Sequence, residues 1–288
     1  SNGSTMTGEH PVRSYCHPAW SSAARQARPR FPGPTEAAVS EEIHVADMTG
    51  QVALVTGGVR GIGLAISKRL AARGVIVAAG YSRDTEAAKR FLDDHPSASV
   101  HQGNIGSVED CQRVIGEVLD QHDRLDILVN NAGITVDRTV PKMTPEEWDR
   151  VVHVNLSGAF YLSRAILQHM LDRGSGRIIN ISSIIGESGN IGQANYAAAK
   201  SGLFGLTMSL AQETARKGIT VNSVAPGYIR TEMVAAVPPE AMEKVLAKIP
   251  IGRFGEPDEV ARVVEFLADP DSGFITGQIY SVNGGQYM

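Results

Sequence analysis

The sequence predicts an α/β fold, namely a doubly wound parallel sheet of about seven strands with helices on both faces. Three observations predict it. Short apolar runs alternate with helical stretches of ten or more residues from residue 51 onward. A glycine-rich turn joins the first run to the first helix. The runs are apolar throughout, as expected of strands that are buried on both faces of a parallel sheet.

The first strand, helix and second strand form one βαβ unit. Residues 51–55 (QVALV) and 75–79 (VIVAA) are the strands, and a helical pattern ends at Arg73 between them. Residues 56–63 read TGGVRGIG, which places glycines between a strand and a helix N-terminus. This context predicts a Rossmann-like dinucleotide site, because glycines let the backbone approach a pyrophosphate and the helix N-terminus presents N–H groups.

The same alternation continues along the chain. Further strands are predicted at residues 99–102, 127–130, 177–181, 220–224 and 278–282. Helices are predicted at residues 85–92, 108–121, 145–154, 158–171, 196–216, 239–247 and 257–267. Since ligands of such sheets bind beyond the carboxyl ends of the strands, we expect the loops there to carry the function.

Residues 1–47 differ in composition from the rest. SNGST, which precedes Met6, resembles a tag remnant, and the following segment is rich in Pro, Ser, Ala and Arg without a hydrophobic period. A flexible leader is the favoured interpretation because the prolines oppose an amphipathic helix. A transit peptide is the alternative, since arginines outnumber acids in this segment. We predict that residues 48–288 form a single domain, which carries the dinucleotide site.

Composition and charge exclude several classes of protein. Of 288 residues, 42% are hydrophobic and 20% charged, which is ordinary for a globular chain with a sizeable core. The net charge of −4 gives no footprint for nucleic acid, and no apolar run reaches the ~20 residues of a membrane span. Cys16 and Cys111 form no C-x-x-C pair, and the histidines lack metal-ligand spacing, so no metal is expected. We therefore expect a soluble, cytoplasmic protein.

The residues after the second strand favour NADP over NAD. An NAD site places an acid at the end of this strand for the ribose hydroxyls. Here Gly80 or Tyr81 takes that position, and Asp84 follows slightly later. Arg60, which we expect to be buried among the glycines, and Arg83 are suited to a 2′-phosphate. Asp84 would weaken this interpretation if the strand runs further than predicted.

Ser183, Tyr196 and Lys200 are candidates for proton transfer at a carbonyl or alcohol oxygen. Tyr196 and Lys200 are four residues apart and so share one face of a helix. A phenol with a pKa near ~10 is a poor acid or base at neutral pH, and a nearby ammonium should lower that pKa. Ser183, after a strand, could hydrogen-bond a substrate carbonyl. Tyr–Lys pairs are also common on helix surfaces, so the set depends on its context.

Residues 50–288 resemble the short-chain dehydrogenase/reductase family. Its motifs occur in order as TGGVRGIG, NNAG (130–133), HVNLSG, YAAAK (196–200) and PGYIRT (226–231). The resemblance implies that Tyr196 is the acid and that Ser183 polarises the carbonyl. It implies that Lys200 binds the nicotinamide ribose and lowers the tyrosine pKa, and that Asn155 holds a water leading to solvent. Ser182 is less suited, because only Ser183 is thirteen residues from Tyr196.

The resemblance also implies cofactor and substrate contacts. The residues that would bind NADP(H) are Gly57, Gly58, Val59, Arg60, Gly61, Ile62, Gly63, Tyr81, Ser82, Arg83, Asn104, Ile105, Asn131, Ala132, Gly133, Tyr196, Lys200, Pro226, Gly227, Ile229 and Thr231. Many members carry Asp-Val where this chain has Asn104 and Ile105, and either pair can contact adenine. The residues that would contact substrate are Ser183, Gln193, Tyr196 and Tyr228.

Within the family, the sequence is most similar to reductases that convert 3-oxoacyl thioesters to 3-hydroxyacyl thioesters with NADPH in fatty acid metabolism. NNAGIT, GQANYAAAK and the terminal VNGG carry this similarity. The acyl group is carried by CoA, as in acetoacetyl-CoA, or by acyl carrier protein, and the motifs divide evenly between these. Arg173, Arg177 and Lys217 offer cations to either carrier, or are ordinary surface charges.

Other functions and the assembly stay open in the sequence. The alternatives are a dehydrogenase of a sugar, polyol or steroid, and a non-catalytic NADP-binding scaffold. Residues 231–254 are expected to form an apolar lid that selects the substrate. The resemblance implies a homotetramer built by residues 158–171 and 196–216 and by the last strand.

Overall fold

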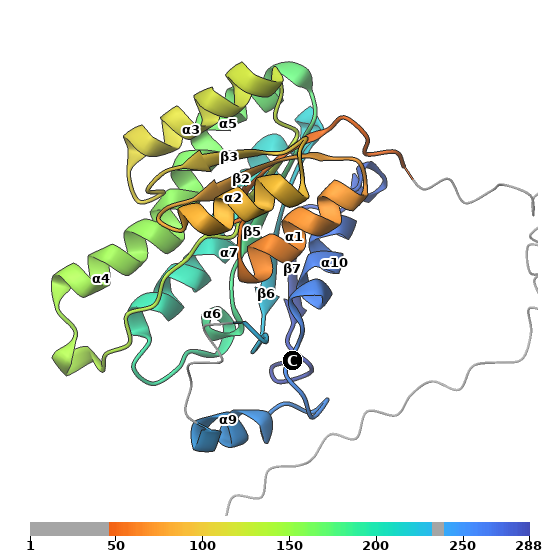
Figure 1. The fold of residues 1–288 in the computed structure, drawn as a ribbon. Coiled ribbons are helices and arrows are strands. Elements are labelled where there is room, and N and C mark those ends of the chain that lie inside the picture. The colour runs from red at the N-terminus through yellow and green to blue at the C-terminus, as the bar shows by residue number, and fades with distance from the viewer. Residues whose placement is uncertain (1–45, 232–238) are drawn as a thin grey trace, which may run out of the picture. The chain divides into compact units, whose positions relative to one another are not determined.

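The computed structural model describes residues 46–231 and 239–288, and within them it contains one sheet of seven strands (Figure 1). The strand order is β3-β2-β1-β4-β5-β6-β7, and all six neighbouring pairs are parallel. The chain crosses from one half of the sheet to the other between β3 and β4. This topology confirms the predicted doubly wound, Rossmann-like α/β fold.

The strands follow the predicted apolar runs, and their ends differ from the prediction by at most two residues. They are β1 Val52–Thr56, β2 Ile76–Tyr81, β3 Ser99–Gln102, β4 Ile127–Asn130, β5 Gly176–Ile181, β6 Ile219–Pro226 and β7 Ile279–Val282. Every residue of β1, β4 and β6 is buried, as a central strand of a parallel sheet requires.

Helices cover both faces of the sheet. They are α1 Gly61–Ala72, α2 Thr85–Asp94, α3 Val108–His122, α4 Pro145–Val152, α5 Gly158–Arg173, α6 Ile184–Ser188, α7 Ala194–Thr214, α9 Pro239–Leu246 and α10 Pro257–Ala268. Side chains of α1, α2 and α10 build one core layer, and those of α3, α5 and α7 build the other. Successive side chains of β4 point to opposite faces of the sheet and so contribute to both layers. Ile127 and Val129 belong to the first layer, and Leu128 belongs to the second.

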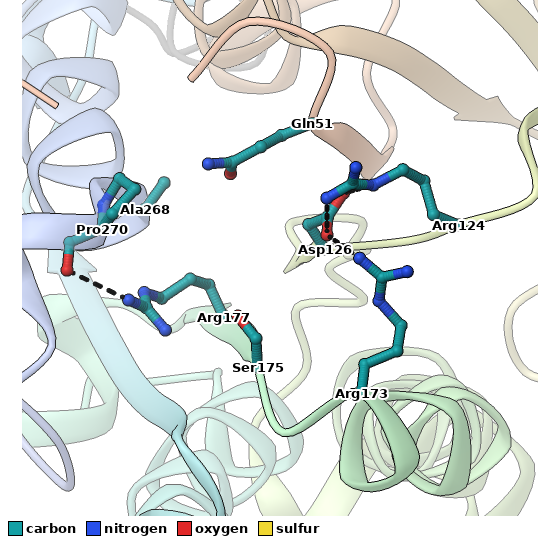
Figure 2. A pocket seen from close by; sticks show the side chains of 8 residues that line it. All are labelled: Gln51, Arg124, Asp126, Arg173, Ser175, Arg177, Ala268 and Pro270. Carbon is teal, nitrogen blue, oxygen red and sulfur yellow. Dashed lines mark hydrogen bonds and ion pairs between the residues drawn. The ribbon is translucent and has the colours of Figure 1, made fainter. Parts of the chain in front are cut away.

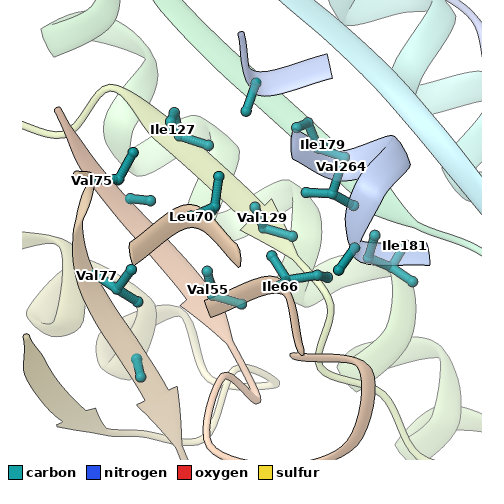
Figure 3. Packing of buried hydrophobic residues seen from close by; sticks show 14 of the residues in the cluster. Val55, Ile66, Leu70, Val75, Val77, Ile127, Val129, Ile179, Ile181 and Val264 are labelled. Atoms are coloured by element: carbon teal, nitrogen blue, oxygen red, sulfur yellow. The ribbon is translucent and has the colours of Figure 1, made fainter. Parts of the chain in front are cut away.

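The first core layer holds α1 at the centre of the sheet. Figure 3 shows Ile66 and Leu70 of α1 and Val264 of α10 in one cluster with side chains of β1, β4 and β5. Full burial of each such side chain contributes about 1.5–3 kcal/mol. At the helix surfaces, Arg69 forms ion pairs with Asp258 at 2.8 Å and with Glu265 at 2.7 Å. Packing and charge together fix the direction of α1.

The structure differs from the prediction between the two helices expected at residues 145–154 and 158–171. A π-helical turn, His153–Ser157, joins α4 to α5, so that the helical path is continuous through Asn155. A single π-helical turn within an α-helix is frequently found at a functional site. The short helix α6, whose N-cap is Ser183, is not among the predicted helices.

Two further predictions concern the chain as a whole. No helix of the described residues is both long and apolar enough to cross a membrane. The predicted division between residues 47 and 48 stays a prediction, and the proposed leader lies almost entirely outside the described part of the chain.

Candidate active site

A cleft of about 1480 Å³ lies along the carboxyl edge of the sheet, where the strands end. The loops after β1 to β6 line it. All of the predicted cofactor residues except the buried Gly58 line this cleft, and so do Ser183, Tyr196 and Lys200. Asn155, Gln193 and Tyr228 do not line it. The structure therefore brings together most of the residues that the sequence singled out.

The N-terminus of α1 opens onto the cleft without a cap. Arg60 precedes the helix, its side chain makes no capping hydrogen bond, and the first turn contains no acid. The φ angle is positive at Gly57 in the preceding turn, 65°, and at Gly61, the first residue of the helix, 51°. Because first-turn N–H groups have no partner within a helix, they favour an anion at this point. These residues fit the pyrophosphate of a dinucleotide.

The loop after β4 is locked to the end of β1. The Asn131 amide donates a hydrogen bond to the carbonyl oxygen of Thr56 at 2.7 Å. The Thr56 hydroxyl accepts from the backbone N–H groups of Asn131 and Ala132, both at 3.0 Å. A Cβ atom at Gly63 would lie 2.6 Å from the Asn131 amide nitrogen, so only glycine permits this approach. The glycine-rich turn and the loop after β4 thus form one rigid floor.

The loop after β2 presents cations rather than a free acid. The strand ends at Tyr81, later than predicted, which brings Asp84 closer to the ribose position. However, the Asp84 carboxylate accepts a hydrogen bond from the Ala87 N–H at 2.9 Å and caps α2. Arg83 and Arg60 are exposed, so the expectation that Arg60 is buried among glycines is wrong: its side chain leaves the turn at the helix N-cap.

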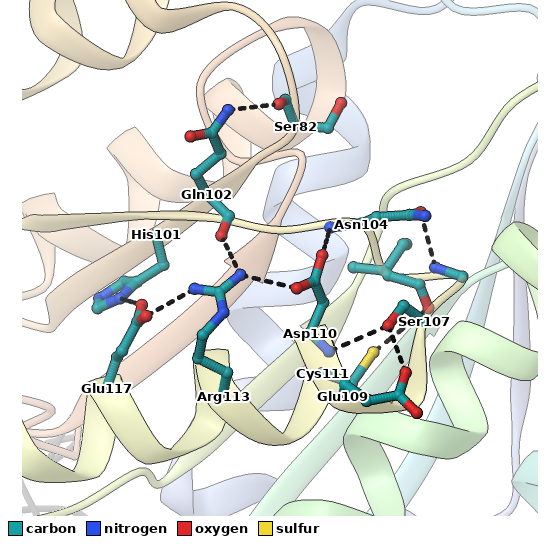
Figure 4. Close-up of polar contacts among 12 residues, drawn as sticks. Ser82, His101, Gln102, Asn104, Ser107, Glu109, Asp110, Cys111, Arg113 and Glu117 are labelled. Carbon is teal, nitrogen blue, oxygen red and sulfur yellow. Dashed lines mark hydrogen bonds and ion pairs between the residues drawn. The ribbon is translucent and has the colours of Figure 1, made fainter.

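A polar network fixes the loop after β3, which the sequence assigned to adenine (Figure 4). The Asp110 carboxylate accepts from the Asn104 N–H at 2.7 Å and from the Arg113 guanidinium at 3.0 Å. Arg113 also donates to the carbonyl oxygen of Gln102 at 2.8 Å and to Glu117 at 2.6 Å. Sequence reasoning missed this network, although the helical spacing of its three charged residues is a visible signal.

Asn155 acts on the cleft through the backbone of Ile134. Its side-chain oxygen accepts from the Ile134 N–H and its amide donates to the Ile134 carbonyl, both at 2.8 Å. Asn155 is only 2% exposed. Each end of the amide can still make one further hydrogen bond, so the role of Asn155 in holding a water stays a prediction. The π-helical turn delivers Asn155 to this position.

Ser183 and Tyr196 meet at the rim of the cleft. Ser183 follows β5, and its hydroxyl accepts from the Ile185 N–H at 3.1 Å. The neighbouring Ser182 donates instead to the carbonyl oxygen of Lys200 at 2.7 Å, a structural contact. Burial raises the pKa of Tyr196, a hydrogen bond with Ser183 lowers it, and the net direction is upward. Tyr196 is thus held in its protonated form at neutral pH.

Lys200 does not lower the pKa of Tyr196 in this structure, contrary to the prediction. Its ammonium donates to the carbonyl oxygen of Ile181 at 2.6 Å and lies 5.7 Å from the centre of the Tyr196 ring. Burial lowers the pKa of Lys200 to about 8, since the protein interior disfavours the charged form. The sequence showed the spacing of the pair but not the burial that controls both groups.

Gly133 permits the close approach of the buried polar groups. A Cβ atom at this position would lie 2.7 Å from the Asn155 side-chain oxygen and 3.5 Å from the Lys200 ammonium nitrogen. A contact of 2.7 Å is shorter than non-bonded atoms allow. The glycine of NNAG is therefore required by the packing of this site.

Gln193, which was predicted to contact substrate, is hydrogen-bonded to an acid that sequence reasoning missed, Asp137. The Gln193 amide donates to both carboxylate oxygens of Asp137, at 3.1 and 3.2 Å. The Asp137 charge contributes to the raised pKa values of Tyr196 and Tyr228, after the larger effect of burial. Gln193 and Tyr228 thus lie near the cleft without lining it, and their contact with substrate stays a prediction. Residues 232–238 of the expected lid lie outside the described part of the chain.

Comparisons with known proteins show which family the chain resembles. A family model described as enoyl-(acyl carrier protein) reductase matches residues 48–286. An acetoacetyl-CoA reductase of Rhizobium meliloti is 53% identical over 239 residues, which cover 83% of this chain and 99% of the relative. One of Shinella zoogloeoides is 51% identical over the same shares. A 3-oxoacyl-[acyl-carrier-protein] reductase of Vibrio cholerae is 46% identical over 244 residues, 84% of this chain and 99% of the relative.

Proposed function

The chain belongs to the short-chain dehydrogenase/reductase family, and from this premise we propose that it reduces 3-oxoacyl thioesters to 3-hydroxyacyl thioesters with NADPH. One observation carries the proposal. Ser183, Tyr196 and Lys200 line the same cleft as the uncapped N-terminus of α1. The site thus joins a proton donor to a pyrophosphate cradle, which is the pairing that carbonyl reduction by a nicotinamide cofactor requires.

The chain's own residues supply the acid and its orientation. When bound, the reduced nicotinamide supplies a hydride to the carbonyl carbon. Tyr196 keeps its proton at neutral pH because burial raises its pKa, and it delivers that proton to the carbonyl oxygen as negative charge develops there. Ser183 donates a second hydrogen bond to the same oxygen. Lys200 binds the ribose hydroxyls.

The preference for NADPH rests on the loop after β2. Asp84 is committed to the cap of α2, so it is a poor partner for ribose hydroxyls, whereas Arg60 and Arg83 are exposed beside the cleft. Both arginines can donate charge-assisted hydrogen bonds to a 2′-phosphate. The test is a comparison of the dissociation constants of NADPH and NADH for wild type and for Arg60→Ala with Arg83→Ala. Equal affinity of the wild type for both cofactors would reject the preference.

The carrier of the acyl group is proposed to be CoA, with acyl carrier protein as the alternative. The similarity to two acetoacetyl-CoA reductases, at 51% and 53% identity, exceeds the 46% identity to the carrier-protein enzyme. Arg173 and Arg177, which the sequence offered to either carrier, line a pocket away from the cleft. The deciding measurement is kcat/KM on acetoacetyl-CoA and on acetoacetyl-acyl carrier protein. A chain that binds NADPH but turns over neither substrate would refute the proposed reaction.

We also propose that the protein is a cytoplasmic homotetramer. Apolar side chains remain exposed on the helices assigned to the interface, with Phe160 of α5 at 46% and Met208 of α7 at 44%. Near the last strand, Phe274 is fully exposed and Phe266 is 49% exposed. Such surfaces favour self-association. Mass in solution tests the assembly, and a monomer at micromolar concentration would reject it.

A further inference from the structure

A second pocket lies at the opposite, amino edge of the sheet, where the strands begin (Figure 2). We call it the amino-edge pocket. Its volume is about 100 Å³, and its lining residues are Gln51, Arg124, Asp126, Arg173, Ser175, Arg177, Ala268 and Pro270. They come from the starts of β1, β4 and β5, from the end of α5, and from the end of α10. The pocket shares no lining residue with the cleft at the carboxyl edge.

The single carboxylate of the amino-edge pocket is saturated. Asp126 accepts two hydrogen bonds from Arg124, both at 2.7 Å, and one from Arg173 at 3.3 Å. It also accepts from the Val52 N–H at 2.9 Å. Four donors therefore use both of its oxygens. Three guanidinium groups and one carboxylate line the pocket, so positive charge is left over.

Arg177 carries the clearest part of this excess charge. Its guanidinium donates only to backbone carbonyls, at 3.0 Å to Gly176, 3.4 Å to Gly218 and 3.2 Å to Pro270. Its Nε atom is buried and has no hydrogen-bond partner, and none of the described residues gives it an ion pair. Burial lowers the pKa of Arg177 without neutralising it, since arginine stays charged in proteins. The charge of Asp269 offsets part of this effect, but Asp269 forms its ion pair with Arg73 at 3.1 Å. A partly buried cation that has no ion-pair partner of its own favours a bound anion.

The size and chemistry of the pocket suit one tetrahedral oxyanion. Its volume far exceeds the ~10–15 Å³ that a single water occupies, yet it is too small for a nucleotide. Guanidinium groups match the oxygens of phosphate in geometry and charge. Arg124 and Arg173 retain free donors, because Asp126 does not use all of theirs. The side chain of Gln51 extends across the same space (Figure 2).

We propose that the amino-edge pocket binds one phosphate group through Arg177, Arg173 and Arg124, and so ties the starts of β4 and β5 to the end of α10. The group can be inorganic phosphate or the terminal phosphate of a monoester. From Arg177 to Ser183 the chain advances roughly 20 Å at ~3.3 Å per residue, so the ligand does not enter the reaction. Its effect is on stability, because a ligand that binds only the folded state stabilises that state.

The test measures thermal unfolding of the full chain in phosphate and in chloride at equal ionic strength. Phosphate should raise the unfolding temperature of wild type but not of Arg177→Met, and titration calorimetry should show one phosphate bound per chain. Without phosphate, Arg177→Met should unfold at the same temperature as wild type or higher, because it removes a partly buried, unpaired cation. The affinity for phosphate should fall about tenfold or more in this variant.

Matched variants separate the pocket from other causes. Arg90→Met removes an exposed arginine of α2 and should keep the full response to phosphate. If Arg177→Met does not fold, Arg173→Gln takes its place, since Arg173 is half-exposed and should weaken phosphate binding as well. Binding of glycerol 3-phosphate as tight as that of inorganic phosphate would identify a monoester ligand, and binding of inorganic phosphate alone a free ion. A phosphate response that survives in Arg177→Met, or its absence in wild type, would overturn the proposal.

Discussion

The two edges of one sheet present opposite means of holding an anion. At the carboxyl edge the cleft offers the backbone N–H groups of the uncapped α1 and a turn of glycines. At the amino edge the pocket offers side-chain cations, and Arg173 stands in the last turn of α5. The polarity of the parallel fold explains the contrast, because helix N-termini gather at one edge and helix C-termini, which favour cations, at the other. Removing single groups should therefore affect catalysis, and at Lys200 also stability, at the carboxyl edge, and stability alone at the amino edge.

The largest effect is expected from Tyr196→Phe at the carboxyl edge. Loss of the acid should lower kcat by about 10²–10⁴-fold, the usual contribution of a general acid. The dissociation constant of NADPH should change little, because the ring remains. Steady-state kinetics should show the fall in kcat, and NADPH fluorescence should show that the cofactor still binds. Wild-type activity in this variant would reject Tyr196 as the acid.

Gly133→Ala tests whether the carboxyl edge depends on close packing. The added Cβ would lie 2.7 Å from the Asn155 side-chain oxygen and must displace it. A misplacement of about 1 Å in an active site costs on the order of 10²-fold in kcat/KM. Gly116→Ala in α3 is the matched control, since its Cβ meets nothing within 4 Å, and it should stabilise the helix by about 0.5–1 kcal/mol. Equal activity of the two variants would contradict the packing argument.

The buried charge of Lys200 should appear in the pH dependence of stability. Its pKa is about 8 in the folded chain and 10.5 in the reference state, so the unfolded chain binds more protons between these values. The free energy of unfolding of cofactor-free wild type should therefore rise with pH across this window, relative to Lys200→Met. The relative gain is on the order of 3 kcal/mol. Denaturant titrations at pH 7.5 to 10 measure it, and parallel curves for the two proteins would refute it.

Asp126→Asn tests the amino edge by the same logic. The substitution removes the carboxylate that Arg124 and Arg173 share, so it should lower the free energy of unfolding by about 1–3 kcal/mol. Phosphate should restore part of that loss, and kcat should not change. A loss of kcat with unchanged stability would mean that the two edges are not independent.

The smallest effect is expected from Asp110→Asn, which loosens the network of Figure 4. Weakening its bonds to Asn104 and Arg113 should raise the KM for NADPH by about threefold to tenfold, the cost of one modest hydrogen bond. The value of kcat should stay the same, because Tyr196 is not affected. Glu86→Gln, on an exposed surface of α2, is the control. A change in kcat alone would assign Asp110 a different role.

The two edges also differ in how well the sequence predicts them. Apolar runs and glycine spacing predicted the seven strands and the turn at Gly57–Gly63, because these signals are local in the chain. The motif residues then fell along one edge, as the polarity of a parallel sheet dictates. The pocket at Arg177 could not be predicted in this way, because its lining residues are spread along the chain from Gln51 to Pro270 and share no motif.

Within the site, the missed features depend on burial and on local geometry. The spacing of Tyr196 and Lys200 predicted their proximity, but not that the ammonium donates to Ile181 or that burial raises the tyrosine pKa. The π-helical turn at Asn155 has no simple sequence signature. Asp137 and Asp110 stand in loops or helix starts where acids are common, so their contacts became visible only in three dimensions.

The cap that Asp84 provides for α2 has a consequence for attempts to redesign the cofactor preference. Deleting Arg60 and Arg83 would remove attraction for a 2′-phosphate without supplying a receptor for free hydroxyls. Recruiting Asp84 to that task would uncap α2, which costs about 0.5–2 kcal/mol. An engineer who wants an NADH-using version should instead introduce a new acid at Tyr81 and leave Asp84 in place. The preference between NADPH and NADH can then be changed without loss of the cap of α2.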